Sequence, residues 1–341
     1  MRSAAVQIQK EGLLQLALGI VTQEGGRAVP PTHVLVPLAG GRGVMLPLGQ
    51  GRLSWEAAQV YLPYRLAGRL QVAVAAGAAT TGLALPGCRL LRLEAEGSLL
   101  WRLCARYWQE PFHFAAYTGI AWAGRKWTVR VMDRTGSVLA YAKVAATPLA
   151  KRLVRNEQAR LAELAGIPGL AGRVPEAIGL WEEGGISVLL LSPLEGRRVP
   201  PRFSGDVRAF LELLPSRGRV RLGDHPLFAE LDAAVAGTEH EEAWVRQRER
   251  LAELEVTWAY QHGDFAPWNL RRTEGGLAAF DWEAARPDGV RELDEMHWRH
   301  MVAQAFGRRG QGTAVAEVLY SFYAALLFPR VGKGGEESGA A

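Results

Sequence analysis

Residues 262–269, "HGDFAPWN", place a histidine, an aspartate and an asparagine in one short stretch with glycine, proline and tryptophan. Asp264 and Asn269 stand five positions apart, in the pattern D-x-x-x-x-N. Asp, Asn, Gly and Pro are common in turns, so the stretch taken alone favours an ordinary polar loop. The residues around it in the sequence decide between a turn and an active-site loop.

A second aspartate follows this stretch. Asp281 stands seventeen residues after Asp264, at the end of an apolar segment and after a predicted hairpin. This is the layout that phosphoryl transfer needs: the first aspartate aligns the attacking hydroxyl, while an asparagine and a second aspartate hold Mg²⁺ against the phosphates of ATP. Glu283 is either a further acid near the metal or a solvated side chain, and the sequence leaves both interpretations open.

Two charged residues upstream fit the same chemistry. Lys143 lies in a predicted strand between apolar or small neighbours, and Glu157 lies in the helix predicted to follow. A strand lysine paired with a helix glutamate is the arrangement by which a kinase holds a positive charge against the α- and β-phosphates. Taken alone, Lys143 is typical of a surface strand. Its order relative to the downstream aspartates favours a phosphate-binding role.

The stretch "HGDFAPWN" followed by "FDWE" resembles the aminoglycoside phosphotransferase and choline kinase superfamily of protein-kinase-like small-molecule kinases. Gly263 stands where protein kinases usually carry arginine, which favours the small-molecule branch. The resemblance covers roughly residues 112–305. It implies an α+β, bilobal, protein-kinase-like fold with a β-rich N-lobe, a mainly helical C-lobe and ATP bound in the cleft.

The resemblance also implies a role for each matching residue. Asp264 would be the catalytic base, and Asn269 and Asp281 would complete the catalytic set as the metal ligands. Lys143 would bind the phosphates of the nucleotide, with Glu157 as its partner. The implied cofactors are ATP and Mg²⁺.

Two further segments match the nucleotide-binding parts of the family. In "LLLSPLEG", the backbone from Ser192 to Leu194 would contact adenine at the hinge between the lobes. In "YTGIAWAGRKW", Gly119 and Gly124 would let the loop cover the nucleotide, although a plain hairpin explains the same two glycines.

Histidines and a later aspartate complete the inventory of polar candidates. His262 would be structural and support the catalytic loop, and Asp294 would brace that loop from a helix. His297 and His300 are three residues apart and lie at no metal-binding spacing, so we expect them to be core or surface residues.

Residues 1–108 form an additional α/β region of unknown role, without a catalytic signature. Two short strands are predicted within 32–49, around a glycine-rich turn. A helix is predicted over 54–77, with Ser54 as its N-cap and a break or kink at Pro63. This region is the candidate site for a protein partner.

The rest of the chain is predicted as an N-lobe over 109–192, a C-lobe over 193–330 and a disordered tail over 331–341. Strand-like alternation and helical periodicity locate the elements of the N-lobe: strands at 112–119, 126–133, 138–145 and 186–196, and a helix at 149–166. The clearest predicted helix of the C-lobe spans 241–260. Its expected apolar stripe consists of Trp244, Val245, Leu251 and Leu254.

Composition limits the classes of function. Of 341 residues, 48% are hydrophobic and 22% charged, as in folded globular proteins. The net charge of +5 suits a phosphate-bearing ligand, but there is no basic block interleaved with aromatics, so we expect no nucleic-acid partner. Two cysteines without a CxxC pair favour a reducing compartment. No apolar run is long enough to span a membrane, and the sequence therefore predicts a cytoplasmic protein.

The sequence thus predicts an enzyme that transfers the γ-phosphoryl group of ATP to a hydroxyl group of a small molecule. The alternative is a non-catalytic, kinase-like nucleotide-binding scaffold or regulatory protein. Protein phosphorylation is less favoured, because no DFG or APE sequence follows the catalytic loop. The acceptor is not identified by the sequence.

Overall fold

The computed structural model describes residues 12, 17–21, 30–109, 111–120, 122–307 and 314–328. These residues fall into two compact units. The first unit comprises the chain up to Gln158 together with Glu176–Pro193, and the second comprises Ala159–Pro175 and the chain from Leu194 onward. The tail predicted over 331–341 lies outside the described residues.

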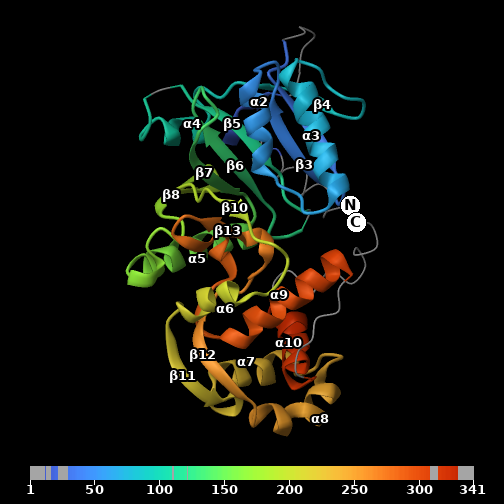
Figure 1. Cartoon of the computed structure of the whole chain (residues 1–341), viewed down its shortest axis with the longest axis vertical. Helices are drawn as coiled ribbons and strands as arrows, with labels where there is room; N and C mark the ends of the chain where they lie inside the picture. Colours follow the sequence, from blue (N-terminus) through green and yellow to red (C-terminus); the bar gives the residue numbers. More distant parts are fainter. Residues whose placement is uncertain are drawn as a thin grey trace. The chain divides into compact units, whose positions relative to one another are not determined.

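The first unit is built on one large sheet (Figure 1). Its strands lie in the order β1-β4-β2-β3-β5-β6-β7-β9-β8, and neighbouring strands pair antiparallel. The strands are β1 (Ile20–Val21), β2 (His33–Leu38), β3 (Arg42–Pro47), β4 (Arg89–Leu93), β5 (His113–Tyr117), β6 (Lys126–Met132), β7 (Val138–Ala145), β8 (Ala177–Glu183) and β9 (Ile186–Leu191). The helices are α2 (Arg52–Ala57), α3 (Leu66–Thr80), α4 (Leu99–Cys104) and α5 (Pro148–Ala165), whose last residues belong to the second unit.

The predicted strands of the N-lobe are confirmed by β5, β6, β7 and β9, and the predicted helix by α5. The strands predicted in the N-terminal region are confirmed by β2 and β3. Val44 of β3 pairs with Tyr117 of β5, so the N-terminal strands continue the same sheet. The predicted boundary at residue 108 therefore falls inside one sheet, between α4 and β5.

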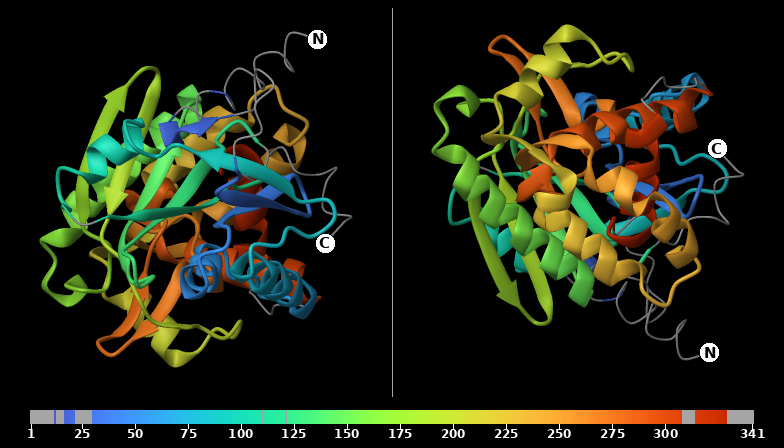
Figure 2. Two further views of the ribbon diagram at one scale, coloured as in Figure 1. Left: turned by 90° about the horizontal axis from the view of Figure 1, so that it is seen from above. Right: turned by 90° about the horizontal axis from the view of Figure 1, so that it is seen from below.

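Apolar cores cover both faces of this sheet. Successive residues of a strand point to opposite faces, so neighbouring residues belong to different cores. In β3, Val44 and Leu46 pack with residues of α2 and α3, which lie side by side (Figure 2). Met45 belongs instead to the core that includes Leu100 and Leu103 of α4. The strand β3 is consequently apolar on both faces, and a charged residue buried in such a sheet needs a partner.

The single helix predicted over 54–77 is wrong in its extent and its cap. The helix α2 begins at Arg52, so Ser54 lies inside it, buried, and its hydroxyl accepts a hydrogen bond from the Gln50 backbone amide at 3.2 Å. The break predicted at Pro63 is confirmed, because α3 begins only at Leu66. Proline lacks the amide hydrogen that a helix interior requires.

The second unit combines a helical core with two three-stranded sheets, β10-β13-β14 and β11-β12-β15. Its helices are α6 (Gly205–Glu212), α7 (Pro226–Val235), α8 (Glu241–Ala252), α9 (Arg291–Phe306) and α10 (Ala314–Leu326). Its strands are β10 (Arg197–Arg198), β11 (Ser216–Arg221), β12 (Glu255–Gln261), β13 (Leu270–Thr273), β14 (Gly276–Ala279) and β15 (Arg286–Val290). The predicted mixture of α and β structure is therefore confirmed, with a β-rich first unit and a helix-rich second unit.

The helix predicted over 241–260 is wrong beyond Ala252. The chain leaves the helix there and enters β12, which pairs with β11 on one side and β15 on the other. The segment 255–261, "EVTWAYQ", contains β-branched and aromatic residues that favour a strand once neighbours supply backbone hydrogen bonds. The predicted apolar stripe is also partly wrong, because Val245 is 65% exposed whereas Trp244 and Leu251 are buried.

Among the described residues, no helix has both the length and the apolar character that crossing a membrane requires.

Candidate active site

Lys143 and Glu157 form a buried ion pair in the first unit. Lys143 Nζ lies 2.5 Å from each carboxylate oxygen of Glu157, and the two residues are 6% and 0% exposed. Lys143 is fixed by β7, which pairs with β6 and β9, and Glu157 by α5. Taking two charges out of water is costly unless they are paired and hydrogen-bonded. The predicted pairing is thus formed, while the predicted phosphate-binding role stays a prediction.

The loop that carries Asp264 is held by an aspartate of α9 in the second unit. The Asp294 carboxylate accepts hydrogen bonds from the backbone amides of His262, at 2.7 Å, and Gly263, at 2.9 Å. Burial raises the pKa of Asp294 to about 7, although the two backbone hydrogen bonds act in the opposite direction. The bracing contact predicted for Asp294 is therefore present.

Gly263 is required by the path of this loop. Its φ is +82°, a conformation that side chains disfavour, and a Cβ atom would lie 2.3 Å from the carbonyl oxygen of Ala284. An arginine, the residue usual in protein kinases at this position, would not fit this backbone.

His262 supports the loop from inside, as predicted. Its ring is fully buried, and burial lowers its pKa to about 4, so the imidazole is neutral near pH 7. Nδ1 accepts a hydrogen bond from the Asp264 backbone amide at 3.2 Å, which leaves Nε2 to donate to the carbonyl oxygen of Phe280 at 3.1 Å. The ring thereby links the Asp264 loop to the end of the β13–β14 hairpin.

Asn269 ties the other end of the loop together. The side-chain NH₂ group of Asn269 donates to the backbone carbonyl oxygen of Asp264 at 2.8 Å. The backbone carbonyl oxygen of Asn269 accepts from the backbone amide of Phe280 at 3.0 Å. Because the NH₂ group is used within the loop, the side-chain oxygen is the atom suited to bind a cation. Phe280 is thus bonded to the loop through both its amide and its carbonyl, and Asp281 is the next residue.

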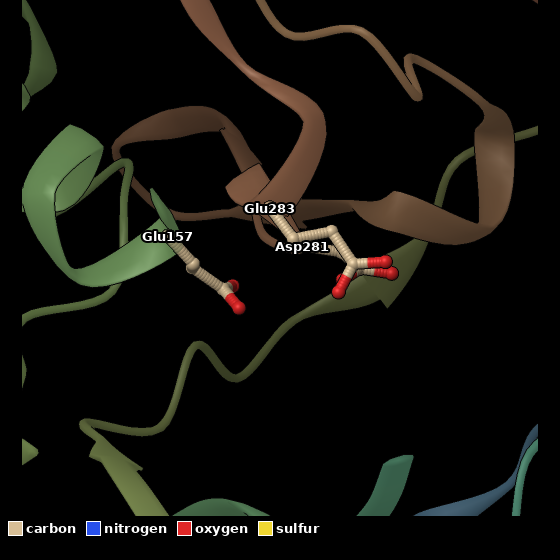
Figure 3. A group of neighbouring side chains, drawn as sticks. All are labelled: Glu157, Asp281 and Glu283. Atoms are coloured by element: carbon tan, nitrogen blue, oxygen red, sulfur yellow. The ribbon is translucent and has the colours of Figure 1, made fainter. Parts of the chain in front are cut away.

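Asp281 and Glu283 bring two carboxylates together in the second unit. Asp281 has a left-handed backbone, with φ 71° and ψ 51°, directly before a short 3₁₀ turn that contains Glu283. Carboxylate oxygens of the two residues lie within 4.8 Å of each other (Figure 3). Glu283 is 1% exposed, so the interpretation as a solvated acid is wrong. Oxygen ligands of this kind, with the Asn269 side-chain oxygen, suit Mg²⁺.

The predicted hinge and nucleotide-covering loop are less fully matched by the structure. The Ser192 amide donates to the Glu176 carbonyl oxygen at 2.9 Å, and the Ser192 hydroxyl accepts from the Glu176 amide at 2.8 Å. The Ser192 N–H is therefore already used within the first unit, and Leu194 begins the second. Contact of either residue with adenine stays a prediction.

Gly119 and Gly124 flank the turn between β5 and β6. Gly119 has φ +67°, and a Cβ atom there would lie 3.0 Å from the Lys126 carbonyl oxygen. A Cβ atom on Gly124 would lie 2.3 Å from the ring of Trp122. Both glycines are thus explained by backbone conformation and packing, and their role over a nucleotide stays a prediction.

The sequence interpretation missed the environment of His297. This residue is buried, and its Nε2 lies 3.0 Å from Asp264 Oδ1 while its Nδ1 lies 2.8 Å from the Tyr320 hydroxyl. A signal was present: His297 stands three residues after Asp294 on α9, and residues at this spacing share a helix face. If Asp294 faces the loop, His297 must face it too.

A scan against protein-family models and a search of curated proteins give no match. Among solved structures, the chain matches an aminoglycoside-3'-phosphotransferase of type VIII at 18% identity and a TM-score of 0.37, covering 65% of this chain and 96% of that one. It matches aminoglycoside phosphotransferase APH(3'')-Id from Streptomyces rimosus ATCC10970 at 16% identity and a TM-score of 0.37, covering 66% and 95%.

A third match is the GDP complex of aminoglycoside 2'-phosphotransferase-IIIa, at 14% identity and a TM-score of 0.35, covering 60% of this chain and 81% of that one. These solved structures are what the chain is similar to, at TM-scores of 0.35 to 0.37. The functional proposal below rests on the side chains of this protein.

Proposed function

We propose that the protein is a phosphotransferase that moves the γ-phosphoryl group of ATP to a hydroxyl group of a small molecule, in the manner of an aminoglycoside phosphotransferase. The observation that carries the proposal is the pair of hydrogen bonds made by Phe280, one to His262 and one to Asn269. They hold Asp281 in fixed register with the loop of Asp264 and Asn269. A base and two oxygen ligands with fixed spacing are what phosphoryl transfer needs.

Each residue has a role in this proposal. Asp264 accepts the proton of the attacking hydroxyl and aligns it with the γ-phosphorus. Asn269 and Asp281 bind Mg²⁺, which neutralises charge on the phosphate oxygens. Lys143, oriented by Glu157, neutralises the α- and β-phosphates.

The metal set extends beyond the residues predicted from the sequence. Glu283 is buried beside Asp281, and a second carboxylate there suits a divalent cation better than a lone one. We propose Glu283 as a further residue of the magnesium site. We further propose that the enzyme works in the cytoplasm, where ATP is supplied and where Cys88 and Cys104 stay free of disulfides.

The test is the substitution Asp264→Asn, which keeps the size of the side chain but removes the proton acceptor. Turnover of Mg-ATP against a panel of amino sugars, amino alcohols and sugars should fall by about 10²- to 10⁴-fold, the usual contribution of a general base. Binding of Mg-ATP, measured by calorimetry, should stay within about threefold, because the base acts in the transition state.

The matched control is Asp224→Asn, an exposed aspartate of the same unit, which should leave turnover and binding unchanged. Equal turnover by the wild type and Asp264→Asn would contradict the role of Asp264. Magnesium-dependent ATP binding by the wild type, without ATP consumption on any acceptor, would contradict the enzyme and favour the scaffold alternative.

A further inference from the structure

The second unit contains a buried polar chain that the proposed reaction does not yet use: Asp264, His297 and Tyr320. We propose that His297 is a positioning residue for Asp264, holding the plane of its carboxylate so that the acceptor hydroxyl meets it in line with the γ-phosphorus. Tyr320 in turn fixes the His297 ring. This inference rests on the proposed function, because it gives His297 a role only through the base.

The direction of the hydrogen bonds follows from the chemistry of the three groups. An ionised carboxylate only accepts hydrogen bonds, so the Nε2 atom that lies 3.0 Å from Asp264 Oδ1 carries a hydrogen. Burial raises the pKa of Tyr320, which keeps its hydroxyl protonated and able to donate to His297 Nδ1 at 2.8 Å. Nε2 thus carries a hydrogen, and when Tyr320 donates to Nδ1 the ring is the Nε2–H tautomer.

Packing leaves the His297 ring little freedom to turn. The ring is 2% exposed, and its centroid lies 5.0 Å from that of Phe328 and 6.0 Å from that of Tyr320. Both neighbours come from the C-terminal part of the described chain, and Tyr320 lies on α10. A side chain held by one polar contact on each nitrogen and by apolar contacts on its ring has a single preferred orientation.

The helix α9 therefore holds the Asp264 loop at two points. Asp294 accepts from the backbone amides of His262 and Gly263, and His297, one turn later, bonds the Asp264 side chain. The first contact places the backbone and the second orients the carboxylate. An error of about 1 Å in a reacting group can cost about 10²-fold in rate, so the second contact is as necessary to the chemistry as the first.

The experiment measures ATP hydrolysis with water as the acceptor, which needs no knowledge of the natural acceptor. His297→Leu removes the hydrogen bond, and His297→Gln keeps a nitrogen donor near the place of Nε2. We expect kcat to fall by about 10- to 100-fold in His297→Leu and less in His297→Gln, with the KM for ATP unchanged in both. Tyr320→Phe should give a smaller loss than His297→Leu.

Two controls separate positioning from a loss of structure. His300→Leu changes a more exposed histidine of the same helix, whose ring also packs on Tyr320, and should leave kcat unchanged. In the double variant Asp264→Asn/His297→Leu, the second substitution should add nothing, because a residue that acts through Asp264 has no effect once the base is gone. Calorimetric binding of Mg-ATP confirms that each variant is folded.

Three results overturn the inference. If His297→Leu changes the Asp264-dependent turnover by less than twofold relative to the wild type, the contact does not orient the base. Losses that multiply in the double variant show that His297 acts elsewhere. A wild type without Asp264-dependent ATP turnover overturns the proposed function, and the role of His297 with it. The ¹⁵N shifts of the His297 ring then still show whether the Nε2–H tautomer is present.

Discussion

The two units hold their proposed functional charges in different ways. In the first unit, Lys143 lies on an inner strand of a sheet and forms an ion pair with Glu157. In the second unit, Asp264 lies on a loop and is positioned by hydrogen bonds from several elements. A residue on a strand takes its position from the register of the sheet, whereas a loop residue needs contacts that fix its backbone and its side chain separately.

This difference predicts different responses to the loss of a partner. Between Thr128 on one neighbouring strand and Leu189 on the other, Lys143 keeps its place even without Glu157, but its buried charge would lose this ion pair. In the loop, the loss of one hydrogen bond leaves the other hydrogen bonds to hold the backbone. The first unit should therefore suffer more in stability from one substitution, and the second more in catalytic geometry.

The largest expected effect is on the ion pair of the first unit. Lys143→Met removes the cation that lies 2.5 Å from the fully buried Glu157 carboxylate, which should lower the free energy of unfolding by about 3–5 kcal/mol. The double variant Lys143→Met/Glu157→Leu should recover most of this loss, because neither buried charge remains. Urea denaturation measures both. A double variant no more stable than Lys143→Met would show that the pair is not the cause.

A second comparison concerns how the stability of each unit responds to low pH. Each unit buries a neutral histidine: burial lowers the pKa of His33 in the first unit and of His262 in the second to about 4. The unfolded chain binds these protons near pH 6.5, so the stability from each neutral histidine is present above pH 6.5 and is lost as the pH falls towards 4. The loss amounts to about 3 kcal/mol per histidine.

Asp294 gives the opposite sign in the second unit. Its pKa is raised to about 7 by burial, so the folded state binds the proton first, and stability present at low pH is lost as the pH rises from about 4 to about 7. This offsets the contribution of His262. We therefore expect the protection of the β12 amides against exchange, relative to the unfolded chain, to depend less on pH between 4 and 7 than that of the β2 amides. His33→Gln should flatten the dependence in β2. Equal slopes in the two strands would contradict the offset.

The sequence predicted the parts of the site that repeat a local pattern. Periodicity in the sequence predicts the strands β5, β6 and β7 and the helix α5. A motif predicts the spacing of Asp264, Asn269 and Asp281. Lys143 and Glu157 could be paired because each lies on a regular element whose direction the pattern fixes.

The parts that were missed depend on tertiary contacts. The strand β12 continues an apolar spacing begun in α8, and only its pairing with β11 and β15 makes it a strand. The contact of His297 with Asp264 joins residues far apart in the sequence, and Tyr320 is further still. Glu283 looks like any surface acid until the fold buries it.

The smallest expected effect on the free energy of unfolding concerns the residue that each unit places in a left-handed backbone conformation. The first unit uses glycine at residue 119, with φ +67°, whereas the second uses Asp281, with φ +71°, the one non-glycine residue with positive φ among those described. A side chain other than glycine in this conformation costs about 1 kcal/mol. We infer that aspartate occupies position 281 despite this conformational cost because its carboxylate is needed there.

Two substitutions at residue 281 separate the cost of the conformation from the use of the carboxylate. Asp281→Gly and Asp281→Ala both remove the proposed metal ligand, so both should abolish ATP turnover. They should differ in stability, with Asp281→Gly about 1 kcal/mol more stable than Asp281→Ala in urea denaturation. Gly119→Ala should cost at least as much in the first unit, because its Cβ would also lie 3.0 Å from the Lys126 carbonyl oxygen. Equal stability of the two variants at residue 281 would mean that this turn, unlike the one at Gly119, relaxes when its side chain changes, and that its hydrogen bonds to the Asp264 loop do not fix its backbone.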